Sequence, residues 1–176
     1  MPRRYEMRLR THPEVTSVQS LAFGWTDWRR PDGGRVTIYV IGLDVGPGSL
    51  SLPRSFDEGL RRALEPDGNV VVDAADLGKL GVRVGDTAEV SGHRVRVAGI
   101  THGLRAIGGA NVFLSRATAA TVLDETFSSD RSAYFLLRLR EPGRAEQVLR
   151  ELQPAGDPPP YRVMHPAQLS DRESVV

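Results

Sequence analysis

Hydrophobic and polar residues alternate in several short stretches of the chain, with a period typical of β-strands. The stretch 35–44 has apolar residues on both faces, so we predict a central strand there. It follows the turn Pro31–Gly34, which predicts a hairpin with the extended residues before it. Further strands are predicted over residues 15–20, 21–28, 69–72, 87–90, 94–100, 111–114, 133–139 and 161–164.

Other stretches have a helical period. Residues 55–64 carry an apolar stripe, and Ser55 with Glu58 three positions later predicts a capping box at the helix start. Asp73 is predicted to cap a helix over residues 73–80, with Gly81 just past its end. Further helices are predicted over residues 2–11, 115–123 (capped by Ser115), 144–152 and from Pro166 onward.

The order of these elements predicts an α+β fold with two lobes. The strand–helix–strand unit after residue 130 resembles the helix and strands before residue 67, whereas the stretch between them is rich in strands. We therefore predict one α/β lobe from residues 1–67 plus 129–176 and an inserted β-rich lobe from residues 68–128. The chain stops at Val176 with no closing turn or polar tail, so we expect a piece excised from a longer protein.

Composition narrows the function classes. The chain has 176 residues, a formal net charge of +1 and no cysteine. The near-zero charge argues against a general nucleic-acid binder, and the lack of cysteine excludes disulfides, thiol catalysis and cysteine-ligated metal sites. No apolar signal region opens the chain, and no stretch approaches the ~18 apolar residues that a membrane helix needs. Arginine dominates the basic residues, so a single arginine carries little functional signal.

No catalytic or cofactor-binding motif stands out. The four histidines (His12, His93, His102 and His165) lack the one-turn spacing of a zinc site. The glycine-rich loops 46–48 and 103–109 lack the features of a phosphate-binding loop. Asp73 and Asp76 have the spacing of a helix cap and a first-turn acid. We therefore predict a non-enzyme without catalytic, cofactor-binding or metal-binding residues.

Two tryptophans are candidate contact residues. Trp25 and Trp28 are three positions apart, and on a strand such residues face opposite sides. We expect one of them to pack inward and the other to lie nearer solvent, where a tryptophan can contact a partner.

Several runs, taken in order, resemble the MacB/FtsX superfamily of ABC-transporter permeases. The main one is Val70–Val90, with "Leu-Gly" at 77–78 and "Gly-Asp" at 85–86, followed by a strand ending Gly99-Ile100. Details in other runs resemble the DevC-like branch: Gly24-Trp25-Thr-Asp-Trp28, Gly42-Leu43-Asp44, Gly109-Ala-Asn111-Val-Phe-Leu-Ser115 and Arg140-Glu-Pro-Gly143.

The resemblance implies an extracytoplasmic domain that lies between the first and second membrane helices of a four-helix permease. The split lobe would be porter-like and the insert Sabre-like. The permease would dimerise and pair with a separate cytosolic ATPase. ATP hydrolysis would move the membrane helices, and the domain would relay this motion so that a substrate is exported or released, or an extracytoplasmic partner is activated. A periplasmic adaptor protein is a further partner that the resemblance implies, and the isolated domain is expected to be monomeric.

Two alternatives remain open at this stage. A soluble, small β-barrel binding module would account for residues 68–128 but not for the flanks. An FtsX-like regulator of cell-wall hydrolases would share the fold and differ only in its partner.

Overall fold

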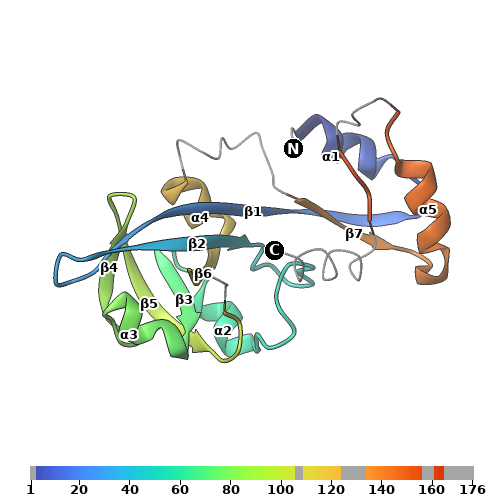
Figure 1. The fold of residues 1–176 in the computed structure, drawn as a ribbon. Helices are drawn as coiled ribbons and strands as arrows, with labels where there is room; N and C mark the ends of the chain where they lie inside the picture. The colour runs from blue at the N-terminus through green and yellow to red at the C-terminus, as the bar shows by residue number, and fades with distance from the viewer. Residues whose placement is uncertain (1–2, 106–108, 124–133, 156–160, 165–176) are drawn as a thin grey trace. The chain divides into compact units, whose positions relative to one another are not determined.

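The computed structural model describes residues 3–105, 109–123, 134–155 and 161–164 (Figure 1). It is a mixed α/β fold, as the sequence predicted, and its strands form one seven-stranded sheet accompanied by short helices. The chain divides into two compact units, Gln19–Leu136 and Met1–Val18 with Leu137–Val176. These bounds differ from the predicted lobes, because 19–67 falls into one unit with 68–128. The Sabre-like assignment of 68–128 stays a prediction.

Within the unit Gln19–Leu136, six strands form a closed ring. The order along the sheet is β2-β6-β3-β5-β4-β1, and β1 pairs back onto β2. Of the pairs of adjacent strands in the ring, β2–β6 and β3–β5 are parallel and the other four are antiparallel. The strands are β1 (Val15–Arg29), β2 (Arg35–Leu43), β3 (Asn69–Asp73), β4 (Thr87–Val90), β5 (His93–Thr101) and β6 (Ala110–Ser115), and β7 (Tyr134–Leu139) continues the sheet beyond β1.

The hairpin and the central strand are confirmed, with one correction. β1 and β2 pair antiparallel from Ala22↔Gly42 to Arg29↔Arg35, and β2 has partners on both sides. The two predicted segments 15–20 and 21–28 are one strand, however. Ser20 is polar, but it is buried and keeps the same phase as buried Val18 and Ala22, so no register break separates the halves.

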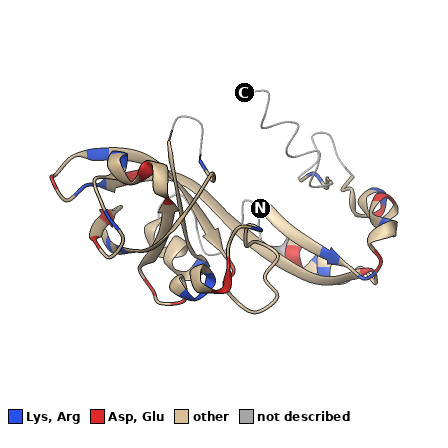
Figure 2. Cartoon of the chain, turned by 90° about the horizontal axis from the view of Figure 1, so that it is seen from below, with Lys and Arg blue, Asp and Glu red and all other residues tan. Residues whose placement is uncertain are grey.

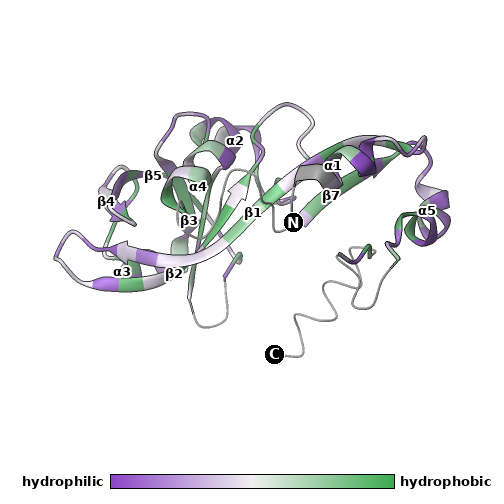
Figure 3. Cartoon of the chain, turned by 90° about the horizontal axis from the view of Figure 1, so that it is seen from above, coloured by the Kyte–Doolittle hydropathy of each residue, from purple (hydrophilic) through white to green (hydrophobic). Residues whose placement is uncertain are grey.

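The core of this unit fills the ring. The buried side chains include Trp28, Ile38 and Val40 from the hairpin, and a second cluster forms around Leu64 and Phe113. In Figure 3 hydrophobic residues concentrate in the strands and hydrophilic ones in the turns. Helix α4 (Arg116–Val122) packs closely on β2: a Cβ added at Gly42 would lie 2.5 Å from the Cβ of Ala119. Glycine is therefore the residue that permits this approach.

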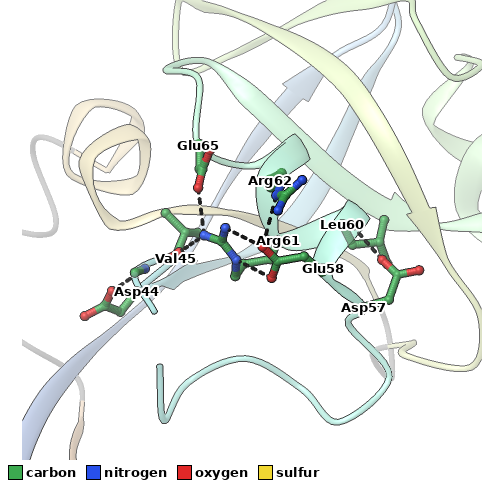
Figure 4. Close-up of polar contacts among 9 residues, drawn as sticks. Asp44, Val45, Asp57, Glu58, Leu60, Arg61, Arg62 and Glu65 are labelled. Atoms are coloured by element: carbon green, nitrogen blue, oxygen red, sulfur yellow. Dashed lines mark hydrogen bonds and ion pairs between the residues drawn. The ribbon is translucent and has the colours of Figure 1, made fainter. Parts of the chain in front are cut away.

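Helix α2 (Glu58–Ala63) begins differently from the prediction. Its N-cap is Asp57, whose Oδ1 accepts a hydrogen bond from the Leu60 N–H at 2.8 Å (Figure 4). The predicted Ser55–Glu58 capping box is therefore wrong. Glu58 instead binds Arg61 at 2.7 Å and Arg62 at 3.0 Å, and the hydrogen bond from Arg61 is the main reason that the pKa of Glu58 falls to about 2.

The other predicted caps are confirmed. Asp73 Oδ1 accepts from the Ala75 N–H at 3.0 Å, although it starts a 3₁₀ turn, η1 (Ala74–Asp76), which leads into α3 (Leu77–Leu80). Gly81 ends α3 with φ of 68°, the left-handed conformation that favours glycine. Ser115 caps α4 by accepting from the Thr118 N–H.

The unit Met1–Val18 with Leu137–Val176 contains α1 (Arg3–Arg10), η2 (Pro142–Arg144) and α5 (Ala145–Leu152), together with the ends of β1 and β7. The backbone N–H of Arg140 donates to the Glu14 carbonyl at 2.8 Å, and Thr16 Oγ1 donates to the Arg138 carbonyl. Among its described residues, the buried apolar side chains are Leu9, Val18, Val148, Leu152 and Tyr161.

The predicted strand over residues 161–164 is wrong. The Tyr161 ring packs edge-on against Tyr5 at 4.9 Å between centroids, and its hydroxyl donates to the Leu152 carbonyl at the end of α5. The Gln153 side chain bonds both the N–H and the carbonyl of Val163. These backbone groups are thus satisfied by a side chain rather than by a neighbouring strand. The helix predicted from Pro166 lies outside the described residues.

Candidate functional site

The described residues contain no group of three or more His, Asp and Glu side chains that could hold a metal ion. His12 donates or accepts at 2.8 Å with Glu151, and His165 lies outside the part of the chain described. Asp73 is buried and receives the N–H groups of Ala75 and Leu104, so its role is structural. Asp76 is also buried, and the Arg105 guanidinium lies 3.9 Å from its Oδ1.

The two tryptophans lie on opposite faces of β1, one buried and one exposed, as the strand period predicted. Trp28 is fully buried in the ring, where its indole Nε1–H donates to the Leu80 carbonyl at 3.1 Å. It has no accessible surface to offer a partner. Trp25 is 55% exposed on the opposite face of β1. Of the two tryptophans, Trp25 therefore remains the candidate contact residue, and its role in binding a partner stays a prediction.

Trp25 is held by its neighbours although it is exposed. Its ring lies 4.7 Å from that of Tyr39, its register partner on β2, at an interplanar angle of 47°. Behind it, a Cβ at Gly109 would lie 2.9 Å from the indole. The row continues along the same face, because Tyr39 stacks on Phe23 at 5.4 Å and Phe23 meets Tyr134 edge-on at 5.5 Å. Trp25 and Tyr134, at the two ends of this row, are its exposed members.

A hollow of about 430 Å³ opens beside Trp25, toward the closed end of the β1–β2 hairpin. Three parts of the chain form it: the two hairpin strands, and the end of β4 with the turn that follows it. β1 pairs with β4 through Trp28↔Val90 and Arg29↔Glu89. The Ser91 N–H donates to the Asp27 carbonyl, and the Thr26 and Ser91 hydroxyls are hydrogen-bonded. The lining residues are Trp25, Thr26, Asp27, Arg29, Arg35, Thr37, Glu89, Ser91 and Gly92.

Charges of both signs line the hollow. Arg29 lies 3.8 Å from Glu89, whereas Arg35 and Asp27 have no side-chain partner among the described residues. Figure 2 shows both signs of charge spread along the chain rather than gathered into one field. The site can therefore bind a molecule that presents an apolar face together with hydrogen-bonding and charged groups, but it holds no nucleophile–base pair.

Sequence reasoning found the tryptophan but missed the hollow. Arg35, Glu89 and Ser91 are brought to Trp25 by the pairing of β1 with both β2 and β4, and the second pairing spans some sixty positions of sequence. The available signal was the strand period, which places Arg29, Asp27 and Trp25 on one face.

Comparison with known proteins rests on structure. No protein-family model matches the sequence, and no curated protein does. The extracellular domain of the ABC-type transporter YknZ from Gram-positive bacteria is similar with a TM-score of 0.55 and 15% identity, over 87% of this chain and 80% of that one. The periplasmic region of MacB from Actinobacillus actinomycetemcomitans is similar with a TM-score of 0.55 and 12% identity, over 99% of this chain and 75% of that one. The chain shares the fold of both domains.

This confirms the fold that the sequence resemblance implied, a mixed α/β domain of the MacB type. The similarity covers nearly the whole chain, so it includes both compact units. None of the helices in the described ranges is long and apolar enough to cross a membrane.

Proposed function

We propose that this chain is the extracytoplasmic domain of an ABC-transporter permease of the MacB/FtsX type, without catalytic residues of its own. The observation that carries the proposal is the shared fold with the extracellular domain of YknZ and the periplasmic region of MacB over 87% and 99% of the chain. The sequence runs between residues 24 and 143 that resemble this superfamily support it independently. The DevC-like branch rests on those runs alone.

In this function the domain has no chemistry to perform and works by changing position. ATP hydrolysis takes place in a separate cytosolic subunit, and the membrane helices of the dimeric permease relay its motion outward. The domain passes that motion to export or release of a substrate, or to an extracytoplasmic partner such as an adaptor protein. The closed strand ring supports this role, because a packed core transmits a displacement as a body rather than absorbing it.

Two other functions compete with this one. A soluble β-barrel module gains support from the closed ring, but the ring uses β1 and β2 in addition to residues 68–128, and the second compact unit has no part in it. A regulator of cell-wall hydrolases has the same location as the transporter domain and differs in the partner that it contacts.

The test uses the absence of cysteine from the chain. Val84 is 52% exposed, and Ala119 is fully buried, so Val84→Cys and Ala119→Cys form a matched pair in the full-length protein. In intact cells, a membrane-impermeant maleimide should label Val84→Cys, and should label Ala119→Cys only after denaturation. The full-length protein without these substitutions gives the background.

Labelling of Val84→Cys only after cell lysis would overturn the extracytoplasmic location. Recovery of the protein in the soluble fraction, at the size of this chain, would favour the binding module instead. If the location holds, co-purification with an ATPase and an adaptor supports export, whereas dependence of a cell-wall hydrolase on the protein supports the regulator.

A further inference from the structure

The hollow beside Trp25 has an unbalanced pair of arginines. Arg29 and Arg35 are register partners on β1 and β2, and like charges directly opposite each other destabilise a sheet. Glu89 lies 3.8 Å from Arg29, and Asp27 lines the same hollow but forms no ion pair with either arginine among the described residues. Arg35 is exposed and has no hydrogen-bond or ion-pair partner within the described residues. A carboxylate placed between the two guanidinium groups would relieve the repulsion and accept hydrogen bonds from both.

The apolar part of the hollow is an exposed indole that is already ordered before any partner binds. The indole of Trp25 is more than half exposed, yet Tyr39 and the close approach of Gly109 fix its position. A side chain that is ordered before binding loses little entropy when it binds. Tryptophan, tyrosine and arginine are the residue types that carry most of the energy at protein–protein contacts, and all three meet here.

The lining also discriminates among ligand classes. A neutral sugar offers no charge to Arg35, and a phosphate can meet the arginines but has no N–H group to donate to Asp27 and Glu89. A polypeptide can present an acidic side chain to the arginines and its own N–H groups to Asp27. The volume of about 430 Å³ accommodates a few side chains of an extended segment.

We propose that this hollow binds an extended segment of a partner protein, with an acidic side chain between Arg29 and Arg35 and a neighbouring apolar or aromatic side chain on Trp25. The identity of the partner as an extracytoplasmic protein rests on the proposed function, but the binding chemistry does not.

The experiment selects peptides from a random dodecamer display library on the 176-residue chain, after removal of the peptides that bind the support alone. We expect the selected peptides to carry Asp or Glu next to an aromatic or apolar residue. Trp25→Ala and Arg35→Glu should each weaken a synthesised winner about tenfold or more, measured by fluorescence anisotropy. Val84→Ala is the matched control, because Val84 is an equally exposed apolar residue outside the hollow, and it should change nothing.

Two further readouts separate binding at this site from a general loss of structure. The indole N–H resonance of Trp25 should shift on titration with the peptide, whereas that of buried Trp28 should not. A peptide whose acidic residue is replaced by lysine should bind Arg35→Glu more tightly than it binds the unsubstituted chain. Gly109→Ala keeps every lining side chain but crowds the indole, and it should weaken binding as well.

Selected peptides without an acidic preference, or with affinities that ignore Trp25 and Arg35, would overturn the proposal. So would a soluble cell-wall oligosaccharide that shifts the Trp25 resonance when no peptide does. Because these measurements use the chain in solution, their failure leaves the cysteine-labelling result untouched, and the two proposals can fail separately.

Discussion

The two compact units are stabilised in different ways. Gln19–Leu136 has a closed ring of strands around a large apolar core, to which every strand of the ring contributes. In Met1–Val18 with Leu137–Val176, the described residues bury few apolar side chains, and polar links join distant segments, such as His12 with Glu151 and Glu14 with Arg144. Apolar burial is non-directional and insensitive to pH, whereas ion pairs depend on protonation and salt. The units should therefore respond differently to the same change of conditions.

The largest effect is expected from Trp28→Ala in the ring. The substitution opens a cavity in the core and deprives the buried Leu80 carbonyl of its indole donor, so the free energy of unfolding should fall by about 3–5 kcal/mol. Trp25→Ala is the matched control on the same strand, and because Trp25 is half exposed it should cost clearly less. Urea unfolding of both variants measures the difference. Equal losses would mean that the ring core is not what stabilises this unit.

Much of the ring could be predicted from the sequence, because its strands and turns are local features. The period of 35–44, the turn Pro31–Gly34 and the left-handed Gly81 each depend on a few neighbouring residues, and each was found in place. The start of α2 shows the limit of such reasoning. Both Ser55 and Asp57 are good N-caps by type, and the choice falls on Asp57, whose side chain reaches the Leu60 N–H.

The rest depends on contacts between distant residues. The return pairing of β1 onto β2 and β4 closes the ring and brings Glu89 and Ser91 to Trp25, and no local period encodes it. In the same way, Tyr161 has the pattern of a strand residue but is held by Tyr5 and the end of α5 instead. The strand period could predict that one tryptophan is exposed, but not what surrounds it.

A smaller effect is expected in the other unit from Arg144→Met. The Glu14 side chain is only 12% exposed, and Arg144 is the cation paired with it. Loss of the guanidinium would leave a largely buried carboxylate unpaired, which costs on the order of 1–3 kcal/mol. Hydrogen exchange should show faster opening of α5 with little change in the ring. Arg150→Met, an exposed position on the same helix, is the control and should exchange as the unsubstituted chain does.

The smallest effect, and the one that bears most directly on the comparison, is a pH dependence of the stability of helix α5. The hydrogen bond from His12, followed by that from Gln147, lowers the pKa of Glu151 below its ordinary value of 4.5. A carboxyl whose pKa is lower in the folded state stabilises the fold at pH values above its pKa in the unfolded chain, and this contribution disappears as the pH falls through the lowered pKa.

Amide exchange in α5 should therefore accelerate as the pH drops below about 4.5, after correction for the intrinsic exchange rate. In Glu151→Gln this dependence should be absent, because glutamine does not titrate. Exchange in β3, inside the ring, serves as the internal reference. If α5 and β3 respond to pH alike, or if Glu151→Gln retains the dependence, then apolar packing stabilises both units and the contrast between them is wrong.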